Sequence, residues 1–252
     1  MIEVKNISKS FNGNPVLKDI SVNFLPGKVN FIIGRSGSGK SVLTKCIVGL
    51  MEVDKGEIIF DERNFTKLDR WDRKEIRQEM GMLFQGSALF DSMTVEENVK
   101  FPLRMFSKMN KSEMLDRVNF CLKRVNLEGK NKLFPSEISG GMQKRTGIAR
   151  AIAMNPKYLF CDEPNSGLDP QTAIVIDNLI REITYEFGST TVVVSHDMNS
   201  VMEIGDNINF IYDGQLWWQG NRKDILEADN KELNDFVFPS HFMKQIRENL
   251  RV

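Results

Sequence analysis

The sequence predicts an α/β fold with a largely parallel β-sheet. Short apolar runs of strand type alternate with segments of helical period, as in βαβ units. A glycine-rich loop joins a predicted strand over residues 29–33 to a predicted helix over residues 41–50. Two further runs, 158–161 and 191–194, are continuously apolar, which is typical of strands buried on both faces. Both end in polar residues, at the edge where such sheets bind ligands.

The remaining strand-type segments predict an antiparallel edge. Residues 1–30 and 56–61 contain short alternating runs that we expect to pair as antiparallel strands at one edge. Asp213 and Gly214 separate two strand-type runs, and this dipeptide is typical of a hairpin turn.

The middle of the chain changes to a helical period, which predicts an inserted helical subdomain at about residues 86–155. Its apolar side chains at helical spacing are Leu115, Val118, Cys121, Leu122 and Val125. Asn110 and Glu113 are placed as an N-terminal capping pair. We therefore expect one domain over residues 1–225, with this subdomain inserted in its core, and a charged helical tail over residues 226–252.

Composition excludes several classes of protein. Hydrophobic residues make up 41% and charged residues 27% of the 252 positions, which is ordinary globular usage. Lys+Arg and Asp+Glu number 34 each, so the chain lacks the positive field that non-specific nucleic-acid binding requires. The three cysteines, Cys46, Cys121 and Cys161, lie in apolar runs and predict buried, reduced thiols.

Nothing in the sequence predicts a membrane-spanning or secretory segment. No run approaches the ~20 apolar residues that cross a bilayer, and the first residues lack a basic region followed by an apolar one. We expect any membrane process to be served from the cytoplasmic side, through a partner.

The first chemical motif is a phosphate-binding loop that follows a strand and opens a helix. Its residues are Gly34, Arg35, Ser36, Gly37, Ser38, Gly39, Lys40 and Ser41. The glycines let backbone N–H groups approach phosphates, and the helix adds its N-terminal dipole. Lys40 is expected to reach the β- and γ-phosphates, and the Ser41 hydroxyl to bind Mg²⁺. The loop predicts a P-loop NTPase core that binds ATP or GTP.

A carboxylate pair supplies the second half of such a site. The apolar run 158–161 delivers Asp162 and Glu163 at its end. Asp162 is expected to hold Mg²⁺, as a Walker B aspartate does. Glu163 is expected to point to the other side of the strand's pleat and to act as general base for attack on the γ-phosphate.

A third segment distinguishes this chain from small-molecule kinases and GTPases. Residues 138–145 read Ile-Ser-Gly-Gly-Met-Gln-Lys-Arg and resemble the signature of the ABC ATPase family. Ser139, Gly140 and Gly141 form a second anion site at a helix N-terminus. The resemblance implies that this site reaches ATP held by another copy, so that a homodimer encloses two ATP molecules. Met142 stands where the family usually carries Gln, so any polar contact that the glutamine side chain would make is absent.

Four further positions resemble the family's motifs. Gln85 matches the glutamine that contacts Mg²⁺ and the attacking water, and His196 matches the switch histidine at the γ-phosphate. Asp169 matches the loop that crosses the dimer interface. Phe11 is placed like the aromatic residue that stacks on adenine, although a core position is the alternative.

The resemblance also implies a membrane permease as partner. Residues 80–142 hold seven of the thirteen methionines. Because methionine side chains are flexible, an exposed group of them can adapt to the shape of a bound partner. A cleft beside Gln85 is expected to accept a cytoplasmic helix of the permease; a methionine-rich core is the alternative.

The segment 84–99 and Met142 are most similar to the ATPases of Mla-type, MCE-associated phospholipid transporters. This implies lipid transport, an MCE-type lipid-binding partner and a location on the cytoplasmic face of the inner membrane. An amino-acid or other small-solute importer is the alternative. A non-transport ABC ATPase is disfavoured, because the chain has neither heptad runs nor a second phosphate loop.

Overall fold

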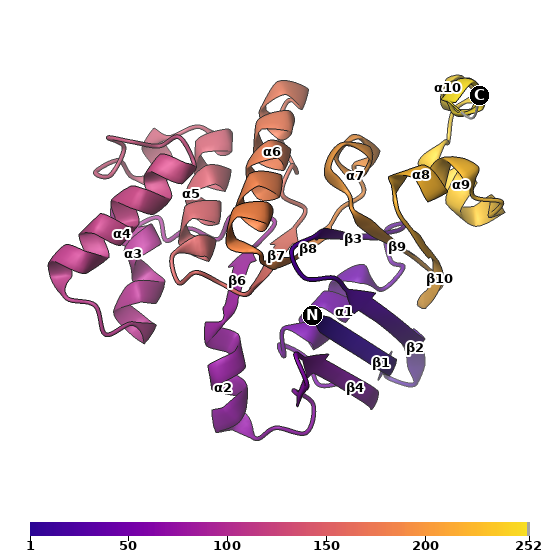
Figure 1. Ribbon diagram of the computed structural model, residues 1–252, viewed down its shortest axis with the longest axis horizontal. Coiled ribbons are helices and arrows are strands. Elements are labelled where there is room, and N and C mark those ends of the chain that lie inside the picture. Colours follow the sequence, from indigo (N-terminus) through magenta and orange to yellow (C-terminus); the bar gives the residue numbers. More distant parts are fainter. Residues whose placement is uncertain (251–252) are drawn as a thin grey trace. The chain divides into compact units, whose positions relative to one another are not determined.

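The computed structural model describes residues 1–250 of the chain, so the last two residues of the expected tail lie outside the described residues. Contacts divide the chain into two compact units. The first unit joins residues 1–68 to the described residues from 194 onward, and the second holds residues 69–193. Strands and helices alternate through both units, which confirms the predicted α/β class (Figure 1).

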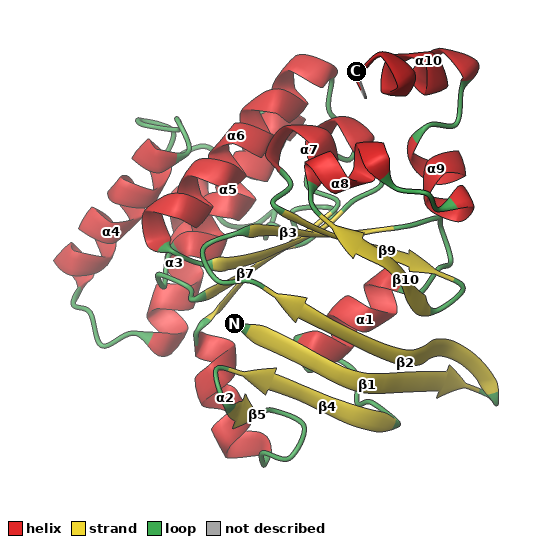
Figure 2. Ribbon diagram, turned by 45° about the vertical axis from the view of Figure 1, so that its right-hand side comes forward, coloured by secondary structure: helices red, strands yellow, loops and turns green. Residues whose placement is uncertain are grey.

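The first unit contains a four-stranded antiparallel sheet in the order β2-β1-β4-β5 (Figure 2). Its strands are β1 (Ile2–Phe11), β2 (Asn14–Phe24), β4 (Lys55–Phe60) and β5 (Arg63–Asn64). Along β2, Val22 and Phe24 are buried while Ser21 and Asn23 are exposed, the alternation of a half-buried strand. Antiparallel pairing of these segments was expected, but β1 and β2 are long strands of a sheet of their own and not short strands at an edge.

A second set of strands in the first unit carries the phosphate-binding loop. The elements are β3 (Val29–Ile33), α1 (Lys40–Ile47), α7 (Met198–Ile204), β9 (Asn207–Tyr212) and β10 (Gln215–Gly220). Strand β9 runs parallel to β3 and antiparallel to β10. Asp213 and Gly214 both have positive φ, 47° and 74°, which confirms the predicted hairpin turn. The described part of the tail is helical, in α8 (Arg222–Glu227), α9 (Lys231–Val237) and α10 (His241–Leu250).

The second unit is built on strands β6 (Met80–Leu83), β7 (Tyr158–Asp162) and β8 (Thr190–Val194), in the order β8-β7-β6. Strand β8 is wholly buried and rich in β-branched residues, as the sequence predicts. Helix α2 (Arg70–Gln78) leads into β6, and α6 (Pro170–Phe187) lies between β7 and β8 in the chain. The carboxylate of Asp169 caps α6, Pro170 takes its first position, and Gly188 ends it with φ 62°.

The remaining elements of the second unit are helices. Helices α3 (Val95–Phe106), α4 (Lys111–Arg124) and α5 (Gly140–Ile152) contact one another, and the short 3₁₀ helix η1 (Pro135–Glu137) precedes α5 (Figure 1). Asn110 and Glu113 form the predicted reciprocal cap of α4.

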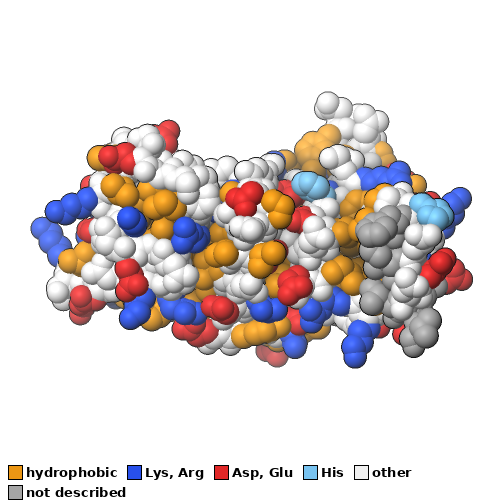
Figure 3. Space-filling view, turned by 90° about the horizontal axis from the view of Figure 1, so that it is seen from above, with side chains coloured by type: hydrophobic (Ala, Val, Ile, Leu, Met, Phe, Trp, Pro, Cys, Tyr) orange, Lys and Arg blue, Asp and Glu red, His pale blue; other side chains and the backbone are white. Residues whose placement is uncertain are grey.

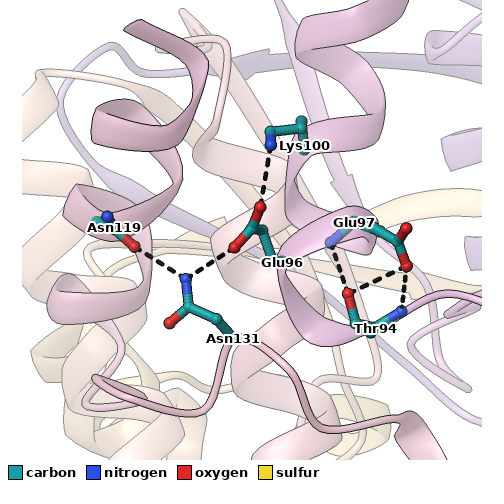
Figure 4. Close-up of polar contacts among 6 residues, drawn as sticks. All are labelled: Thr94, Glu96, Glu97, Lys100, Asn119 and Asn131. Atoms are coloured by element: carbon teal, nitrogen blue, oxygen red, sulfur yellow. Dashed lines mark hydrogen bonds and ion pairs between the residues drawn. The ribbon is translucent and has the colours of Figure 1, made fainter. Parts of the chain in front are cut away.

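Polar contacts fix the start of α3 to its neighbours (Figure 4). Thr94 and Glu97 cap each other's backbone N–H groups. Glu96 accepts hydrogen bonds from Lys100 at 3.0 Å and from Asn131 at 3.2 Å, and Asn131 also donates to Asn119 at 2.9 Å. The loop that leads toward residue 139 is thereby tied to both α3 and α4.

The predicted state of the cysteines is confirmed. Cys46, Cys121 and Cys161 are free and buried, and burial raises the pKa of their thiols to about 11, 11 and 12. On the face drawn in Figure 3, acidic and basic side chains are interspersed, which agrees with the balanced charge of the sequence. Among residues 1–250, no helix combines the length and apolar character needed to span a bilayer.

Candidate nucleotide site

The loop between β3 and α1 folds around the side chain of Lys40. Its ammonium donates hydrogen bonds to the carbonyl oxygens of Gly34 at 2.8 Å and Arg35 at 2.9 Å. The lysine is buried, with 8% of its surface exposed, while Arg35 and Ser41 are exposed. A buried ammonium group at the N-terminus of a helix is suited to bind an anion.

Glycine is required at two positions of this loop. Gly34 has φ 150°, and a Cβ there would lie 2.2 Å from the carbonyl oxygen of Ile211. Gly39 has φ 103°, and a Cβ would lie 2.9 Å from a methyl carbon of Leu17. The backbone conformation and the close approach of β2 and β9 therefore both select glycine.

The hydroxyl oxygen of Ser38 is buried in this loop without a hydrogen-bond partner in the structure. Its backbone N–H donates to Arg35 at 3.1 Å. An unsatisfied buried hydroxyl is costly unless a ligand completes its hydrogen bonding. The loop residues thus fit a bound phosphate, and the Ser41 hydroxyl, exposed at the first turn of α1, fits a Mg²⁺ ligand.

Two more predicted residues lie in the first unit. Phe11 ends β1 with 39% of its surface exposed, and the ammonium of Lys9 lies 5.7 Å from its ring centroid. An exposed ring is free to stack on a base, whereas the alternative of a core phenylalanine is wrong. His196 is exposed and follows β8, next to the buried Ser195.

The carboxylate pair lies at the end of β7 in the second unit. The strand ends at Asp162, so Glu163 lies in the turn that follows, with φ 47°. The expectation that strand pleating orients Glu163 is therefore wrong; a left-handed turn residue sets its direction. Both side chains are half-buried.

The signature segment forms the start of α5, as predicted. Ser139 caps the helix by accepting a hydrogen bond from the backbone N–H of Met142 at 3.3 Å. Gly140 and Gly141 occupy its first turn, where backbone N–H groups have no partner within the helix. A Cβ on Gly141 would lie 2.7 Å from a methyl carbon of Thr172, so close packing against α6 also requires glycine there.

The remaining two predicted residues differ in their surroundings. Gln85 is exposed and follows β6. Asp169 uses its carboxylate to cap α6, with Thr172 donating from its backbone N–H at 3.0 Å and from its hydroxyl at 2.6 Å. These hydrogen bonds hold the pKa of Asp169 below its ordinary value.

The sequence interpretation missed two cationic residues of α5. Lys144 donates to the carbonyl oxygens of Gln85 and Glu163, and Arg150 donates to those of Ser87 and Ala88. A usable signal existed, because Lys144 falls on the buried helix face with Ile148 and Ala151, at i, i+4 and i+7.

An apolar groove of about 420 Å³ lies beside the segment that contains Gln85. Aromatic and methionine side chains line it, and the rings of Phe90 and Phe101 contact each other at 4.8 Å between centroids. Its lining residues include Met80, Met82, Phe84, Phe90, Phe101, Phe106 and Met154. Phe84, Phe90 and Phe106 are exposed there by 39%, 41% and 45% of their surfaces.

Comparison with known proteins identifies the family. Residues 17–166 match the sequence model described as ABC transporter. The "Probable ribonucleotide transport ATP-binding protein mkl" of Mycobacterium leprae is 38% identical over 94% of this chain, which spans 68% of that relative. The "Methionine import ATP-binding protein MetN" of Clostridium tetani is 37% identical over the whole chain, which spans 79% of that relative.

Solved structures agree with this similarity. The ATP-binding cassette MJ0796, described in a dimeric post-hydrolysis state bound to ADP and Pi, superposes with a TM-score of 0.80 and 33% identity. The superposition covers 88% of this chain and 99% of the cassette. The chain therefore belongs to the ABC transporter family, as an ATP-binding subunit that hydrolyses ATP with Mg²⁺.

Proposed function

We propose that two copies of this chain hydrolyse ATP to drive phospholipid transport through a separate membrane permease. ABC ATPases work as dimers with permease partners, and the dimeric cassette MJ0796 is one structural relative. In this proposal the chain is peripheral, on the cytoplasmic face of the inner membrane. Residues 1–225 form the ATPase domain, with the helical subdomain at about 86–155, and residues 226–252 form its tail.

Each predicted site residue has a place in the proposed reaction. Lys40 and the loop backbone bind the phosphates, and Phe11 stacks on adenine. Mg²⁺, when bound, would neutralise charge on the phosphates. Its proposed protein ligands are Ser41, Gln85 and Asp162.

The proposed chemistry is attack of water on the γ-phosphate. Glu163 accepts a proton from the water, and Gln85 orients that water. His196 donates a hydrogen bond toward the γ-phosphate. The N–H groups of the segment Ser139, Gly140, Gly141 and Met142 contact the ATP held by the second copy, and Asp169 lies at the interface between copies.

The apolar groove is the observation that carries the coupling to a permease. Three exposed phenylalanines, Phe84, Phe90 and Phe106, line a concavity, and the first two lie within five residues of Gln85 in the chain. A groove of this kind fits an amphipathic helix, which buries its apolar face between aromatic side chains. Binding there places a permease helix against the segment that holds the water-orienting glutamine.

Phospholipid as cargo is supported by the resemblance of residues 84–99 and of Met142 to the Mla-type ATPases. This proposal includes an MCE-type lipid-binding partner. A methionine or other small-solute importer is the second candidate, because the MetN relative matches the whole chain.

Purification of the native complex from membranes distinguishes these two candidates. Mass spectrometry of the complex should identify an MCE-type protein, the permease and bound phospholipid. Detection of a solute-binding protein, together with ATPase stimulation by methionine, would overturn the lipid assignment and leave the ATPase assignment intact.

Substitution of the proposed base tests the reaction itself. Glu163→Gln should lower the hydrolysis rate by roughly 10²–10⁴-fold, the usual worth of a general base. ATP binding should persist, because the amide keeps the size and polarity of the side chain. Phosphate release and equilibrium ATP binding measure these two effects. Turnover at the unaltered rate would remove Glu163 from the mechanism.

A further inference from the structure

Lys144 is a buried cation in the second unit. Only 5% of its surface is exposed, and α5, which carries it, packs against β6. Burial lowers the pKa of Lys144, and attraction to the carboxylates of Glu163 and Asp162 opposes that effect. Lysine is rarely buried to this extent, because its ammonium loses its hydration. The hydrogen bonds that replace the lost hydration of the ammonium therefore indicate the role of Lys144.

The ammonium of Lys144 bridges two backbone carbonyl groups. It donates to the carbonyl oxygen of Gln85 and, at 3.4 Å, to that of Glu163. These acceptors are 59 and 19 residues away in the chain. One side chain thus joins the segment after β6 to the turn after β7.

The turn at Glu163 needs such a contact. Its φ of 47° lies in the left-handed region, and Pro164 follows it. The proline ring restricts the backbone of the residue before it, and a left-handed non-glycine residue is strained. Such conformations persist where surrounding contacts fix them. The Glu163 carbonyl oxygen accepts from Lys144 and also from the backbone N–H of Ser166 at 3.1 Å.

The segment after Gln85 also contains left-handed residues that contacts from α5 hold in place. Ser87 and Ala88 are consecutive left-handed residues, with φ 60° and 46°. Arg150, six residues further along α5 than Lys144, donates to the Ser87 carbonyl at 2.5 Å and to the Ala88 carbonyl at 2.7 Å. A single helix therefore holds this segment at two points.

We propose that Lys144 is a positioning residue for ATP hydrolysis, which fixes the backbone of Glu163 relative to that of Gln85. This inference rests on the proposed roles of those two residues as base and water-orienting group. The water between them must lie within hydrogen-bond reach of both, so a shift of either backbone separates the groups that act on it.

Three variants of the full chain test the proposal. Lys144→Met removes the ammonium and keeps the length of the side chain, and Lys144→Arg keeps a cationic donor. Lys123→Met is the matched control, because Lys123 is an exposed lysine of α4 in the same unit.

Lys144→Met should lower kcat by about 10–100-fold, as misplacement by about 1 Å does, with KM for ATP changed by less than about 2-fold. Lys144→Arg should recover most of this loss. Hydrogen exchange of the nucleotide-free chain should rise in peptides covering residues 84–90 and 162–168 in Lys144→Met alone. Lys123→Met should match the unaltered chain in every measurement.

Two results would overturn the proposal. One is a kcat of Lys144→Met within about 2-fold of the unaltered chain, since a misplaced base or glutamine cannot keep the full rate. The other is that Lys144→Met loses kcat, ATP affinity and thermal stability in proportion, and that Lys144→Arg restores none of the three. These results would show that Lys144 has a structural role only.

The Glu163→Gln background separates this inference from the proposed function. If Lys144 acts by placing Glu163 relative to Gln85, Lys144→Met should lower the residual rate of Glu163→Gln by a smaller factor than it lowers kcat of the unaltered chain. A multiplicative loss would assign Lys144 a role independent of Glu163 and overturn the inference alone. Full turnover of the single variant Glu163→Gln would instead overturn the base assignment, whatever Lys144→Met does.

Discussion

Gly34 shows how one residue of the phosphate-binding loop is constrained from two directions. Its φ of 150° disfavours any side chain, and a Cβ would lie 2.2 Å from the Ile211 carbonyl oxygen and 2.8 Å from the Ser38 hydroxyl. The first neighbour is backbone of β9, which cannot rotate away. The loop therefore depends on glycine here even before a phosphate is bound.

Gly34→Ala should destabilise the chain by about 1–3 kcal/mol, the usual cost of overpacking. ATP binding should weaken roughly 100-fold, because that strain displaces the loop from the phosphate-binding conformation. Denaturant unfolding and equilibrium nucleotide binding measure the two effects. In Gly86→Ala the new Cβ would meet no atom within 4 Å, so its stability should change by less than about 0.5 kcal/mol. Equal losses in the two variants would contradict this explanation.

At the scale of elements, Asn98 of α3 ties the preceding loop to the helix. It is fully buried, accepts from the backbone N–H of Phe90 at 2.8 Å, and donates to three carbonyl groups. Those acceptors are the carbonyl oxygens of Phe90, Met93 and Thr94. Because Phe90 lines the apolar groove, this amide also holds one wall of the proposed permease site.

Asn98→Leu should lower the free energy of unfolding by about 2–3 kcal/mol, since it leaves buried backbone groups without partners. Permease binding should weaken as well, because Phe90 loses its fixed position. Calorimetry and affinity measurements with the permease check these outcomes. Asn199→Leu, at an exposed amide of α7, should change stability by less than about 0.5 kcal/mol. An Asn98→Leu chain of unchanged stability would show that the loop before α3 keeps its conformation without this side chain.

The elements also show what could be predicted from sequence. The phosphate loop, the strands before it and before Asp162, the cap of α4 and the start of α5 are local, so spacing along the chain revealed them. The separate antiparallel sheet was not revealed, because alternation gives a strand but not its sheet. Lys144 and Arg150 were missed because their acceptors lie up to 59 and 63 residues away.

At the scale of the whole molecule, the proposed site needs two chains. The phosphate loop belongs to the first compact unit and the signature to the second. By the family resemblance, the phosphate loop binds the ATP of its own copy, and the signature contacts the ATP held by the other copy. In a dimer of this type, each site combines Lys40 from one copy with Ser139 from the other.

Mixing two inactive variants tests this arrangement. Lys40→Ala and Ser139→Ala chains should each be inactive alone, because every site lacks one component. An equimolar mixture should regain about one quarter of full activity, since half of the dimers are mixed and each keeps one complete site out of two. Steady-state phosphate release at fixed total protein measures the recovery. A mixture as inactive as its parts would contradict sites shared between chains.

The burial of all three thiols in the described core has a practical consequence. The thiolate is the form of cysteine that attacks thiol reagents, and the raised pKa values of Cys46, Cys121 and Cys161 leave almost no thiolate at neutral pH. Maleimide fluorophores or spin labels would therefore mark only a cysteine introduced at the surface. Distances between two such labels could follow the approach of two subunits during turnover, with every native cysteine left in place.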